Sequence, residues 1–516
     1  MIRISLFVLL FFTIQTTFSQ CSLDSVYWFN QIQQRTEALI LAPTFRMQGE
    51  QNSYGILELN QQFGQGRFRQ AQQAFSNRNT SFTAKGFNQL GRFHVGAVFT
   101  FNNQYEDSLA NNLRSNLNDL ATFYPYANQS GRYQRQNYKL NAALAFQATD
   151  HVKPFIKLDY LYHWSAGTVD PRLKATRFEL RAKPGVAFTY GAHQLGVYGI
   201  IGKGDEQVSL SYKNDVFSNS MLYPDRIYHM SYGYGSSVIR DFSNNYKYDS
   251  YLGGGLEYAS MFRDWKMQAN AEWQRYHNTN QITSKGSAYY TGIVGEFELQ
   301  SWKANLALFG PSNKSTQQSF SLDALYQSGF DGNIRTTGSL DIVNYKVNTL
   351  DLLGRYDLLW DKDKPFSKEI GLDVKYASSS RQDLVQSVDF NIADVDIGAH
   401  FRAYVQQRSG NRMKFAVLPY FRLPTETSLT YNTYSKSEFV RNVIFTDYYY
   451  NAARYVGSQF QAEYIGQFFG KNHLGFYANF DYRRASNPEL RPDFDPTFVP
   501  NGNRWETNVG IRMYIQ

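Results

Sequence analysis

The sequence predicts a single transmembrane antiparallel β-barrel of the outer-membrane type, an all-β fold of roughly 16–18 strands. Three observations lead to this prediction: a signal-like N-terminus, apolar and polar residues that alternate along most of the chain, and connections that are short and long in turn. The predicted organisation is a signal peptide at residues 1–19, a short periplasmic segment at 20–53 and the barrel at 54–516.

The first residues predict export from the cytoplasm. Arg3 precedes an apolar run at residues 6–14. A basic start followed by roughly 7–15 apolar residues is typical of a secretory signal peptide, and such a run is too short to span a bilayer. Ser19 is small, as the residue before a cleavage site usually is, so the predicted cut lies before Gln20. Cys21 permits a second interpretation, an acylated lipoprotein, which is less favoured because Gln20 is not small.

Composition favours a membrane barrel over a soluble enzyme. The mean hydropathy is −0.48, yet the chain contains 40 Phe and 39 Tyr residues. In a membrane barrel half of each strand faces lipid, half faces the lumen, and aromatic rings gather at both interfaces. No apolar run after residue 14 approaches the roughly 18 residues of a membrane-spanning helix. A single cysteine excludes an intrachain disulfide framework.

The charge distribution argues against nucleic acid as a partner. Removal of Arg3 with the signal leaves 51 basic and 44 acidic residues, a net charge of +7. These charges are interleaved along the chain, whereas a nucleic-acid interface needs a clustered basic face.

Alternation with a period of two is clearest at the end of the chain. The apolar set is Trp505, Thr507, Val509, Ile511, Met513 and Ile515, and the polar set is Glu506, Asn508, Gly510, Arg512, Tyr514 and Gln516. Successive side chains of a strand point to opposite faces, so this segment is a strand with one apolar side. The same pattern occurs at residues 138–147, 372–376, 396–403 and 473–483. A helix would instead repeat its apolar positions every three or four residues.

The connections separate a membrane barrel from a soluble β-sandwich, whose strands also alternate. Short turns are expected near residues 90–91, 150–151, 191–192, 263–264, 361–365, 409–411 and 470–472, and long polar loops near 103–132, 214–245, 423–447 and 485–503. Short periplasmic turns and long external loops are typical of outer-membrane barrels. Their number predicts about 18 strands, with 16 as the alternative. Near residues 299–302 the apolar phase shifts, which indicates a bulge or an extra turn.

The C-terminal residues predict an assembly signal. Asn508, Gly510, Met513 and Ile515 follow the polar–x–Gly–x–x–apolar–x–apolar ending by which barrel-assembly machinery recognises its clients. That pattern usually ends near an aromatic residue, whereas here Gln516 follows Ile515.

Several short motifs point to one family. They are Ser53-Tyr54-Gly55, Gly64-x-Gly66-x-Phe68-Arg69, Asp170-Pro171-Arg172, Pro184-Gly185-Val186, Tyr190-Gly191-x-His193-x-Leu195-Gly196, Gly253-Gly254-Gly255 and Tyr448-Tyr449-Tyr450-Asn451-Ala452. In these stretches the chain resembles an uncharacterised family of bacterial outer-membrane β-barrel proteins, classed as a domain of unknown function. The resemblance implies a barrel in the outer membrane of a Gram-negative cell. It implies no activity.

Catalytic and metal chemistry are not favoured by the sequence. The histidines are scattered without metal-ligand spacing, so no metal or cofactor is expected, and His400 is interpreted as a lumen residue. His163 and Ser165 resemble the His-x-Ser pair of outer-membrane lipid hydrolases, because residues two apart share a strand face. Their face is the lumen side, however, where acyl chains cannot reach, so a lipid hydrolase is only a remote alternative and the chain is not expected to be an enzyme.

Two hypotheses for function remain. The first is a passive channel or transporter for small solutes. Its predicted pore-lining residues are Lys139, Lys157, Asp159, Glu272, Asp373, Lys375, His400, Arg402, Asp481 and Arg483. Opposite charges lie two residues apart on several strands, so we expect neighbours such as Lys157 and Asp159 to neutralise one another and leave a weak field.

The second hypothesis is a barrel that transports nothing: a scaffold, an adhesin or the partner of a surface lipoprotein. It is supported by the long loops, including the aromatic stretch at residues 218–236, which would bind a partner or fold inward and close the pore. Either way the expected partners are outer-membrane lipid, lipopolysaccharide and the barrel-assembly machinery.

Overall fold

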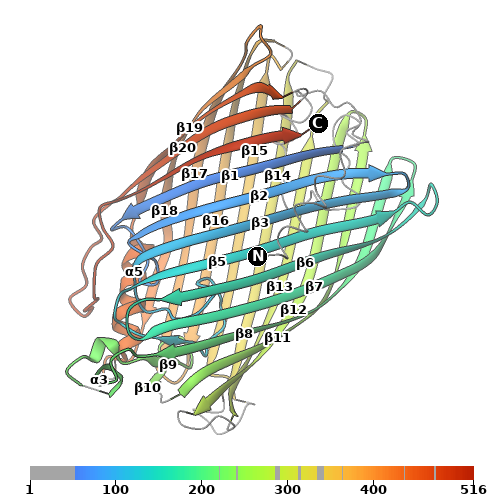
Figure 1. The fold of residues 1–516 in the computed structure, drawn as a ribbon. Helices are drawn as coiled ribbons and strands as arrows, with labels where there is room; N and C mark the ends of the chain where they lie inside the picture. The colour runs from blue at the N-terminus through green and yellow to red at the C-terminus, as the bar shows by residue number, and fades with distance from the viewer. Residues whose placement is uncertain are drawn as a thin grey trace.

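A computed structural model shows a closed barrel of 18 antiparallel strands (Figure 1). It describes residues 53–515 except 220, 240–241, 285–290, 312–314, 334–341, 363, 435 and 470–471. The ring strands are β1 (Ser53–Gly66), β2 (Ser76–Leu90), β3 (Phe93–Leu109), β5 (Gly131–Phe146), β6 (Val152–Gly167), β7 (Arg172–Tyr190), β8 (His193–Ser211), β11 (Phe242–Phe262), β12 (Trp265–Ser284), β13 (Thr291–Phe309), β14 (Gln317–Asn333), β15 (Tyr345–Trp360), β16 (Phe366–Asp383), β17 (Val388–Gln406), β18 (Arg412–Thr430), β19 (Tyr455–Phe469), β20 (Asn472–Ala485) and β21 (Asn503–Ile515). The predicted fold class is confirmed, with the larger of the two strand numbers. The predicted signal peptide and nearly all of the periplasmic segment lie outside the described residues.

Each ring strand pairs with its neighbours along the chain, and the ring is closed by the first and last strands. β1 and β21 pair from Gly55 opposite Ile515 to Gly66 opposite Arg504. Both described ends of the chain therefore lie at the end of the barrel that carries the short turns. A closed ring leaves no sheet edge with unpaired backbone groups, as a lipid environment requires.

The two faces of the wall differ in polarity. Leu144, Phe476 and Ile511 point outward, with 42%, 49% and 43% of their surface exposed. Arg512 and Tyr514 on the same last strand point inward and are buried at 6% and 0%. The described part of the chain has no helix that is long and apolar enough to cross a membrane. Because the strands carry apolar side chains outside and mostly polar side chains inside a closed ring, this is an integral outer-membrane barrel.

The predicted short turns near residues 90–91, 150–151, 191–192, 263–264 and 409–411 are confirmed, whereas residue 363 of the turn at 361–365 and residues 470–471 of the turn at 470–472 lie outside the described residues. One correction concerns residues 299–302. β13 runs without a break through these residues, in continuous register with β14 from Gly295 to Phe309. Phe297 and Leu299 are buried on the inner face, whereas Trp302 is 54% exposed on the outer face. The apolar phase shifts because the inner face is itself apolar at this level. The turn missed by the sequence lies after Gly310, which leads into β14.

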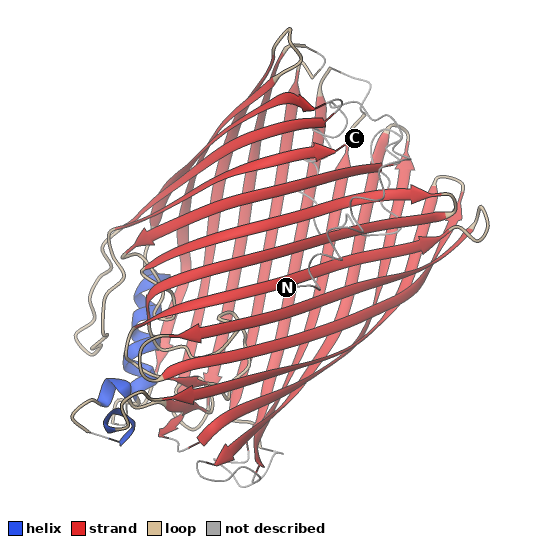
Figure 2. Cartoon of the chain, in the orientation of Figure 1, coloured by secondary structure: helices blue, strands red, loops and turns tan. Residues whose placement is uncertain are grey.

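The inner face is apolar there because the long loops fold back into the barrel. We call the segments 67–75, 110–130, 212–241, 431–454 and 486–502 the cap. It contains β4 (Pro125–Tyr126), α3 (Val216–Asn219), η2 (Pro224–Arg226), β9 (His229–Ser231), β10 (Ser237–Ile239), η3 (Val440–Ile444) and α5 (Phe445–Ala452). β10, β9 and β4 form a separate small sheet. Figure 2 shows the helices and loops gathered at one end of the barrel, opposite the short turns.

Candidate functional site

The cap is held together by an aromatic core. The ring of Tyr234 stacks on Phe390 of β17 at a centroid distance of 6.1 Å and contacts Phe439 at 5.8 Å. Phe445 of α5 stacks on Phe494 at 4.4 Å. Each of these rings is at most 7% exposed. The aromatic stretch at residues 218–236 therefore folds inward over residues 228–236, one of the two outcomes considered from the sequence.

Polar contacts attach the cap to wall strands all around the ring. They are Arg135 of β5 with the Arg114 carbonyl, Glu206 of β8 with the Ser115 N–H, Asn245 of β11 with the Phe123 carbonyl, Asn333 of β14 with the Tyr232 carbonyl, Asp383 of β16 with the Ser236 N–H, Arg422 of β18 with Asn451, and Arg504 of β21 with the Ala74 carbonyl. Attachments that encircle the ring require the cap to span the lumen. Most of them are hydrogen bonds from wall side chains to loop backbone.

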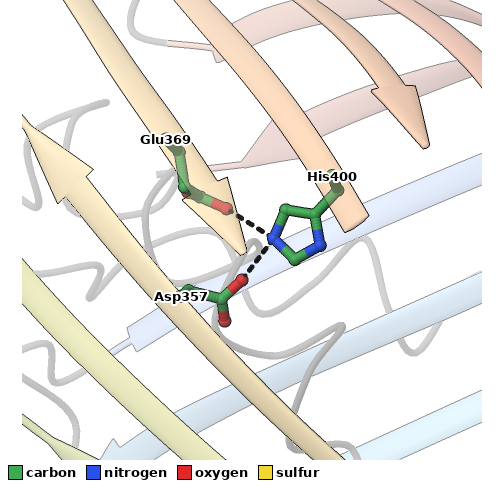
Figure 3. A group of neighbouring side chains, drawn as sticks. All are labelled: Asp357, Glu369 and His400. Atoms are coloured by element: carbon green, nitrogen blue, oxygen red, sulfur yellow. Dashed lines mark hydrogen bonds and ion pairs between the residues drawn. The ribbon is translucent and has the colours of Figure 1, made fainter. Parts of the chain in front are cut away.

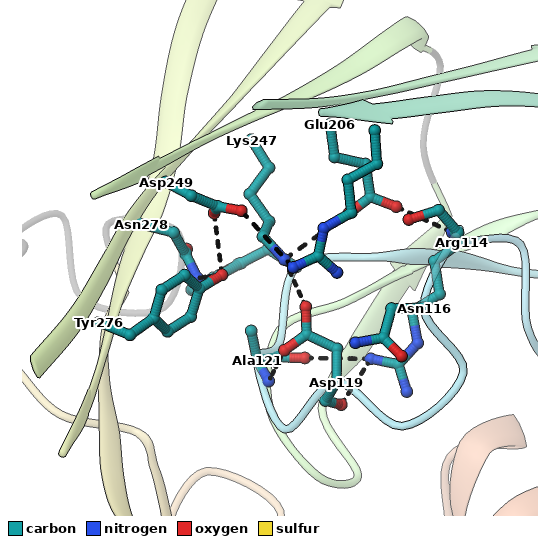
Figure 4. A network of polar contacts seen from close by, with 12 residues as sticks. Arg114, Asn116, Asp119, Ala121, Glu206, Lys247, Asp249, Tyr276 and Asn278 are labelled. Carbon is teal, nitrogen blue, oxygen red and sulfur yellow. Dashed lines mark hydrogen bonds and ion pairs between the residues drawn. The ribbon is translucent and has the colours of Figure 1, made fainter. Parts of the chain in front are cut away.

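One ion pair anchors the segment 110–130, and we call it the latch. Lys247 of β11 bonds to Asp119, and its ammonium also lies 3.6 Å from the carboxylate of Glu206 (Figure 4). Arg114 reinforces the same loop by donating to the Asp119 carbonyl at 2.9 Å. Burial acts to raise the pKa of Asp119, but Lys247, Arg177 and Arg114 outweigh it and hold that pKa well below its usual range. The latch is therefore charged at neutral pH.

A second carboxylate in the cap behaves in the opposite way. Phe445 and Tyr449 lie one turn apart on α5 and are buried in the aromatic core, which leaves Asp447 facing the loop at 67–75. The Asp447 carboxylate accepts a hydrogen bond from the Ala71 N–H at 2.9 Å. Burial raises the pKa of Asp447 to about 6, against smaller lowering effects from Ala71 and Arg381. Asp447 is therefore harder to ionise in the closed cap than in water, and it becomes mostly protonated only below about pH 6.

This pKa predicts that the cap is more stable in mild acid. A carboxyl group whose pKa is raised on folding stabilises the folded state below its unfolded pKa, and this contribution is lost as the pH rises through about 6. We expect amide exchange in α5, corrected for intrinsic rates, to slow by the equivalent of about 1.4 kcal/mol between pH 7.5 and pH 5. Asp447→Asn should remove this dependence.

The control accounts for His229, whose protonation has the opposite effect on the stability of the closed cap. Burial lowers the pKa of His229, so its protonation in acid opposes closure. His229 is present in both proteins, and the difference between wild type and Asp447→Asn isolates the carboxylate. Equal pH profiles for the two proteins would contradict the assignment.

The predicted pore-lining residues lie on the inner face, below the cap. Lys157 bonds to Glu257 of β11. The ammonium of Lys183 lies 3.2 Å from Asp159 and 2.8 Å from Glu272. The remaining contacts of these residues are Asp373 with Arg355 at 4.0 Å, Lys375 with Asp351 at 3.8 Å, Asp481 with the Tyr420 hydroxyl at 2.5 Å and Arg483 with Glu506 at 3.1 Å. Whether solutes pass these residues stays a prediction.

The charged residues predicted to line the pore bond mostly across strands. In the described residues Lys157 and Asp159 each bond to other strands, and the same holds for Asp373, Lys375 and Asp481. Pairing within one strand also occurs, as between Arg177 and Glu179 of β7 at 3.0 Å. The lumen charges thus form a belt of ion pairs around the wall. Whether charges two residues apart also weaken the field along the lumen stays a prediction.

A buried cluster surrounds His400 (Figure 3). Its Nε2 lies 2.6 Å from the Asp357 carboxylate and 3.6 Å from Glu369. Oxygen and nitrogen atoms of the three residues lie within 4.8 Å of one another, a spacing that could hold a metal ion. Arg402, however, bonds to Glu369 and lies 3.5 Å from Asp357. This guanidinium already supplies the positive charge that a metal would bring. Sequence spacing missed the cluster because its members come from β15, β16 and β17.

His163 and Ser165 both point inward, as their strand face predicts. They are 3% and 0% exposed. Nδ1 of His163 lies 2.7 Å from the Asn137 side-chain oxygen, while its Nε2 and the Ser165 hydroxyl have no hydrogen-bond partner in the described structure. The imidazole is therefore not placed to activate this hydroxyl in the arrangement seen here.

A cavity of about 430 Å³ opens where the cap meets the wall below the latch. Ser115 and Asn116 of the cap form one side. The wall side is polar and comes from β5, β6 and β7, with Asn137, Lys139, Asn141, Asp159, His163, Arg177, Glu179 and Arg181 among its residues. Of the predicted pore-lining residues, the cavity brings together Lys139 and Asp159.

The chain is similar to one protein family in sequence and to several outer-membrane proteins in structure. A family model described as "Family of unknown function (DUF6850)" matches residues 43–515. No curated protein matches the chain. Among solved structures, the copper transporter OprC is 10% identical with a TM-score of 0.35, covering 91% of this chain and 82% of its own. BauA, the ferric preacinetobactin receptor from Acinetobacter baumannii, is 10% identical with a TM-score of 0.40, covering 89% and 80%. OccAB3 from Acinetobacter baumannii is 12% identical with a TM-score of 0.32, covering 90% and 100%.

Proposed function

We propose that this chain, which belongs to the DUF6850 family of unknown function, forms a gated passive channel for small polar solutes. The observation that carries the proposal is the cap. It is made of loops of the barrel itself and is attached to the wall through side chains that can exchange partners with water. Below it, the wall carries polar and charged residues on its inner face. An 18-stranded ring is wide enough to leave an aqueous path once such a cap moves.

The latch gives the gate a specific point of control. Lys247 is 5% exposed and serves Asp119 of the cap and Glu206 of the wall. Asp249 lies on the same strand face, two residues away, and accepts a hydrogen bond from the Tyr276 hydroxyl at 2.9 Å. Without Lys247 these carboxylates would lose the ammonium that they share and keep only Arg177 as a common cation, so they would repel one another. The least costly response is for the segment 110–130 to leave the wall.

Single-channel recording tests the proposal. In planar bilayers we expect wild type to be mostly closed with brief openings, and Lys247→Met to raise the open probability by at least tenfold, because a buried carboxylate that loses its partner costs about 3 kcal/mol or more. Arg275→Met is the matched control. It removes an ion pair with Glu298 on the outside of the barrel, where Arg275 has a half-exposed side chain.

Trypsin digestion shows whether the cap has moved. A Lys247→Met protein that becomes sensitive to trypsin at Arg114 yet passes no current would contradict the channel. That result would favour the second hypothesis, a barrel that serves as scaffold or partner of a surface protein. One observation favours it independently: Met221 and Leu222 in the loop before β9 are 77% and 83% exposed, which suits a surface that another protein covers.

A further inference from the structure

One positive charge at the cavity below the latch has no carboxylate among the described residues to compensate it. Glu179 is held by Arg177 at 3.0 Å and by Arg181 at 3.1 Å. Asp159 is held by Lys183 at 3.2 Å. Both carboxylates of the lining are thus compensated by guanidinium or ammonium groups, and each contact is within hydrogen-bonding distance or close to it.

The uncompensated cation is the ammonium group of Lys139. It lines the cavity from β5, and no residue in the described part of the chain forms an ion pair or hydrogen bond with it. Its ammonium is exposed to the lumen, between the side chains of Asn137 and Asn141 on the same strand face. An uncompensated cation beside two amides at a concave surface is suited to an anionic group of a ligand.

The wall of the cavity also offers neutral polar groups. The amide of Asn116 comes from the cap, and those of Asn137 and Asn141 come from β5. Nδ1 of His163 bonds to the side-chain oxygen of Asn137, and Nε2 of the same ring has no partner in the described structure but is buried while the cap is closed. The Ser115 hydroxyl is already engaged by the Glu206 carboxylate. The amides are therefore the groups that can pair with the hydroxyl groups of a solute.

We propose that this cavity binds a small polyhydroxylated carboxylate, such as a sugar acid. The carboxylate lies at Lys139, and hydroxyl groups of the same molecule exchange hydrogen bonds with the amides of Asn116 and Asn141, which line the same cavity. A cavity of about 430 Å³ lies within the usual range for sites that hold small molecules. This inference deepens the proposed function, because a solute bound where the cap meets the wall is one that the opened channel would carry.

Calorimetry on the full chain in detergent tests the chemistry directly, with three probes. Glucuronate has both the carboxylate and the hydroxyls, glucose has the hydroxyls alone, and acetate has the carboxylate alone. We expect glucuronate to bind about tenfold or more tightly than either of the others. Equal binding of glucuronate and glucose, or of glucuronate and acetate, would overturn the proposal.

Two lysine variants locate the site. Lys139→Met should abolish the preference for glucuronate over glucose. Lys303→Met should preserve it, since Lys303 lies on β13, shares the inner face with Glu272 opposite it, and does not line the cavity. A glucuronate preference that survives in Lys139→Met would place the binding elsewhere and refute the assignment.

Binding and conductance separate this inference from the proposed function. Glucuronate binding that depends on Lys139 in a barrel that never conducts would keep the site and remove the channel. Conductance in Lys247→Met without glucuronate binding to wild type would keep the channel and remove the site.

Discussion

Replacement of Arg512 by Met is expected to destabilise the barrel by about 3–5 kcal/mol. Arg512 of β21 donates to Glu58 of β1 at 2.8 Å and to Glu463 of β19 at 2.7 Å. Its guanidinium also lies 4.5 Å from the ring centre of Tyr477. Only 6% of Arg512 is exposed, so the two carboxylates would keep their charge in a buried setting without a shared cation. Urea unfolding in lipid vesicles measures the loss.

The charge partners provide the controls for this experiment. The triple variant with Arg512→Met, Glu58→Gln and Glu463→Gln should recover part of the lost stability, because the two carboxylates no longer lack their cation, while the buried Lys414, 3.9 Å from Glu463, loses that partner. Arg355→Met removes a contact of 4.0 Å between side chains that are 29% and 34% exposed, and we expect it to cost at most about 1 kcal/mol. If Arg512→Met and Arg355→Met lowered the stability of the barrel equally, the buried network around Arg512 would not stabilise the contact between β1 and β21.

Arginine on the lipid face is the second substitution with a large expected effect. Phe476→Arg should cost about 2–4 kcal/mol if the site lies near the bilayer midplane. Phe476 is 49% exposed on the outer face of β20, on the same side as Phe480. Leu144→Arg should cost less, because Leu144 is near the end of β5 and its guanidinium can reach the interface.

The matched substitutions use the opposite faces of the same two strands. Asn479 lies opposite Asn508 on the inner side of β20, and Asn141 lines the polar cavity. Arginine at either position meets water or polar groups and should be tolerated far better. Refolding into vesicles at a series of urea concentrations gives the four values. If Phe476→Arg and Asn479→Arg behaved alike, the assignment of faces would be wrong.

The wall could be predicted from the sequence because each strand face meets a uniform environment. Lipid selects apolar residues such as Val509 and Ile511 on one side, and the lumen selects residues such as Asn508 and Arg512 on the other, so a period of two survives along the strand. The short turns were also predictable, since their Gly and Asp residues interrupt that period at regular intervals. Counting the turns left 16 and 18 strands open, because the turn after Gly310 was missed.

The cap could not be predicted because its environment is made by the cap itself. Phe297 and Leu299 are apolar on the inner face, where the wall pattern demands polar residues, and only the folded loops explain them. The latch joins Asp119 to Lys247, residues 128 positions apart, through contacts that leave no local pattern. The aromatic stretch at residues 218–236 was compatible with binding a partner and with folding inward. Its composition does not distinguish these outcomes, because exposed loops and inward-folded loops share the same composition.

The seam between β1 and β21 constrains how the barrel can assemble. Arg512 and Glu58 are 454 residues apart in the sequence, and contacts of such high separation form slowly because a long loop must close first. Until they meet, both strands present unpaired backbone groups, which hydrocarbon does not tolerate. Insertion into the membrane and closure of the ring must therefore occur together. The Arg512 network is then among the last contacts to form.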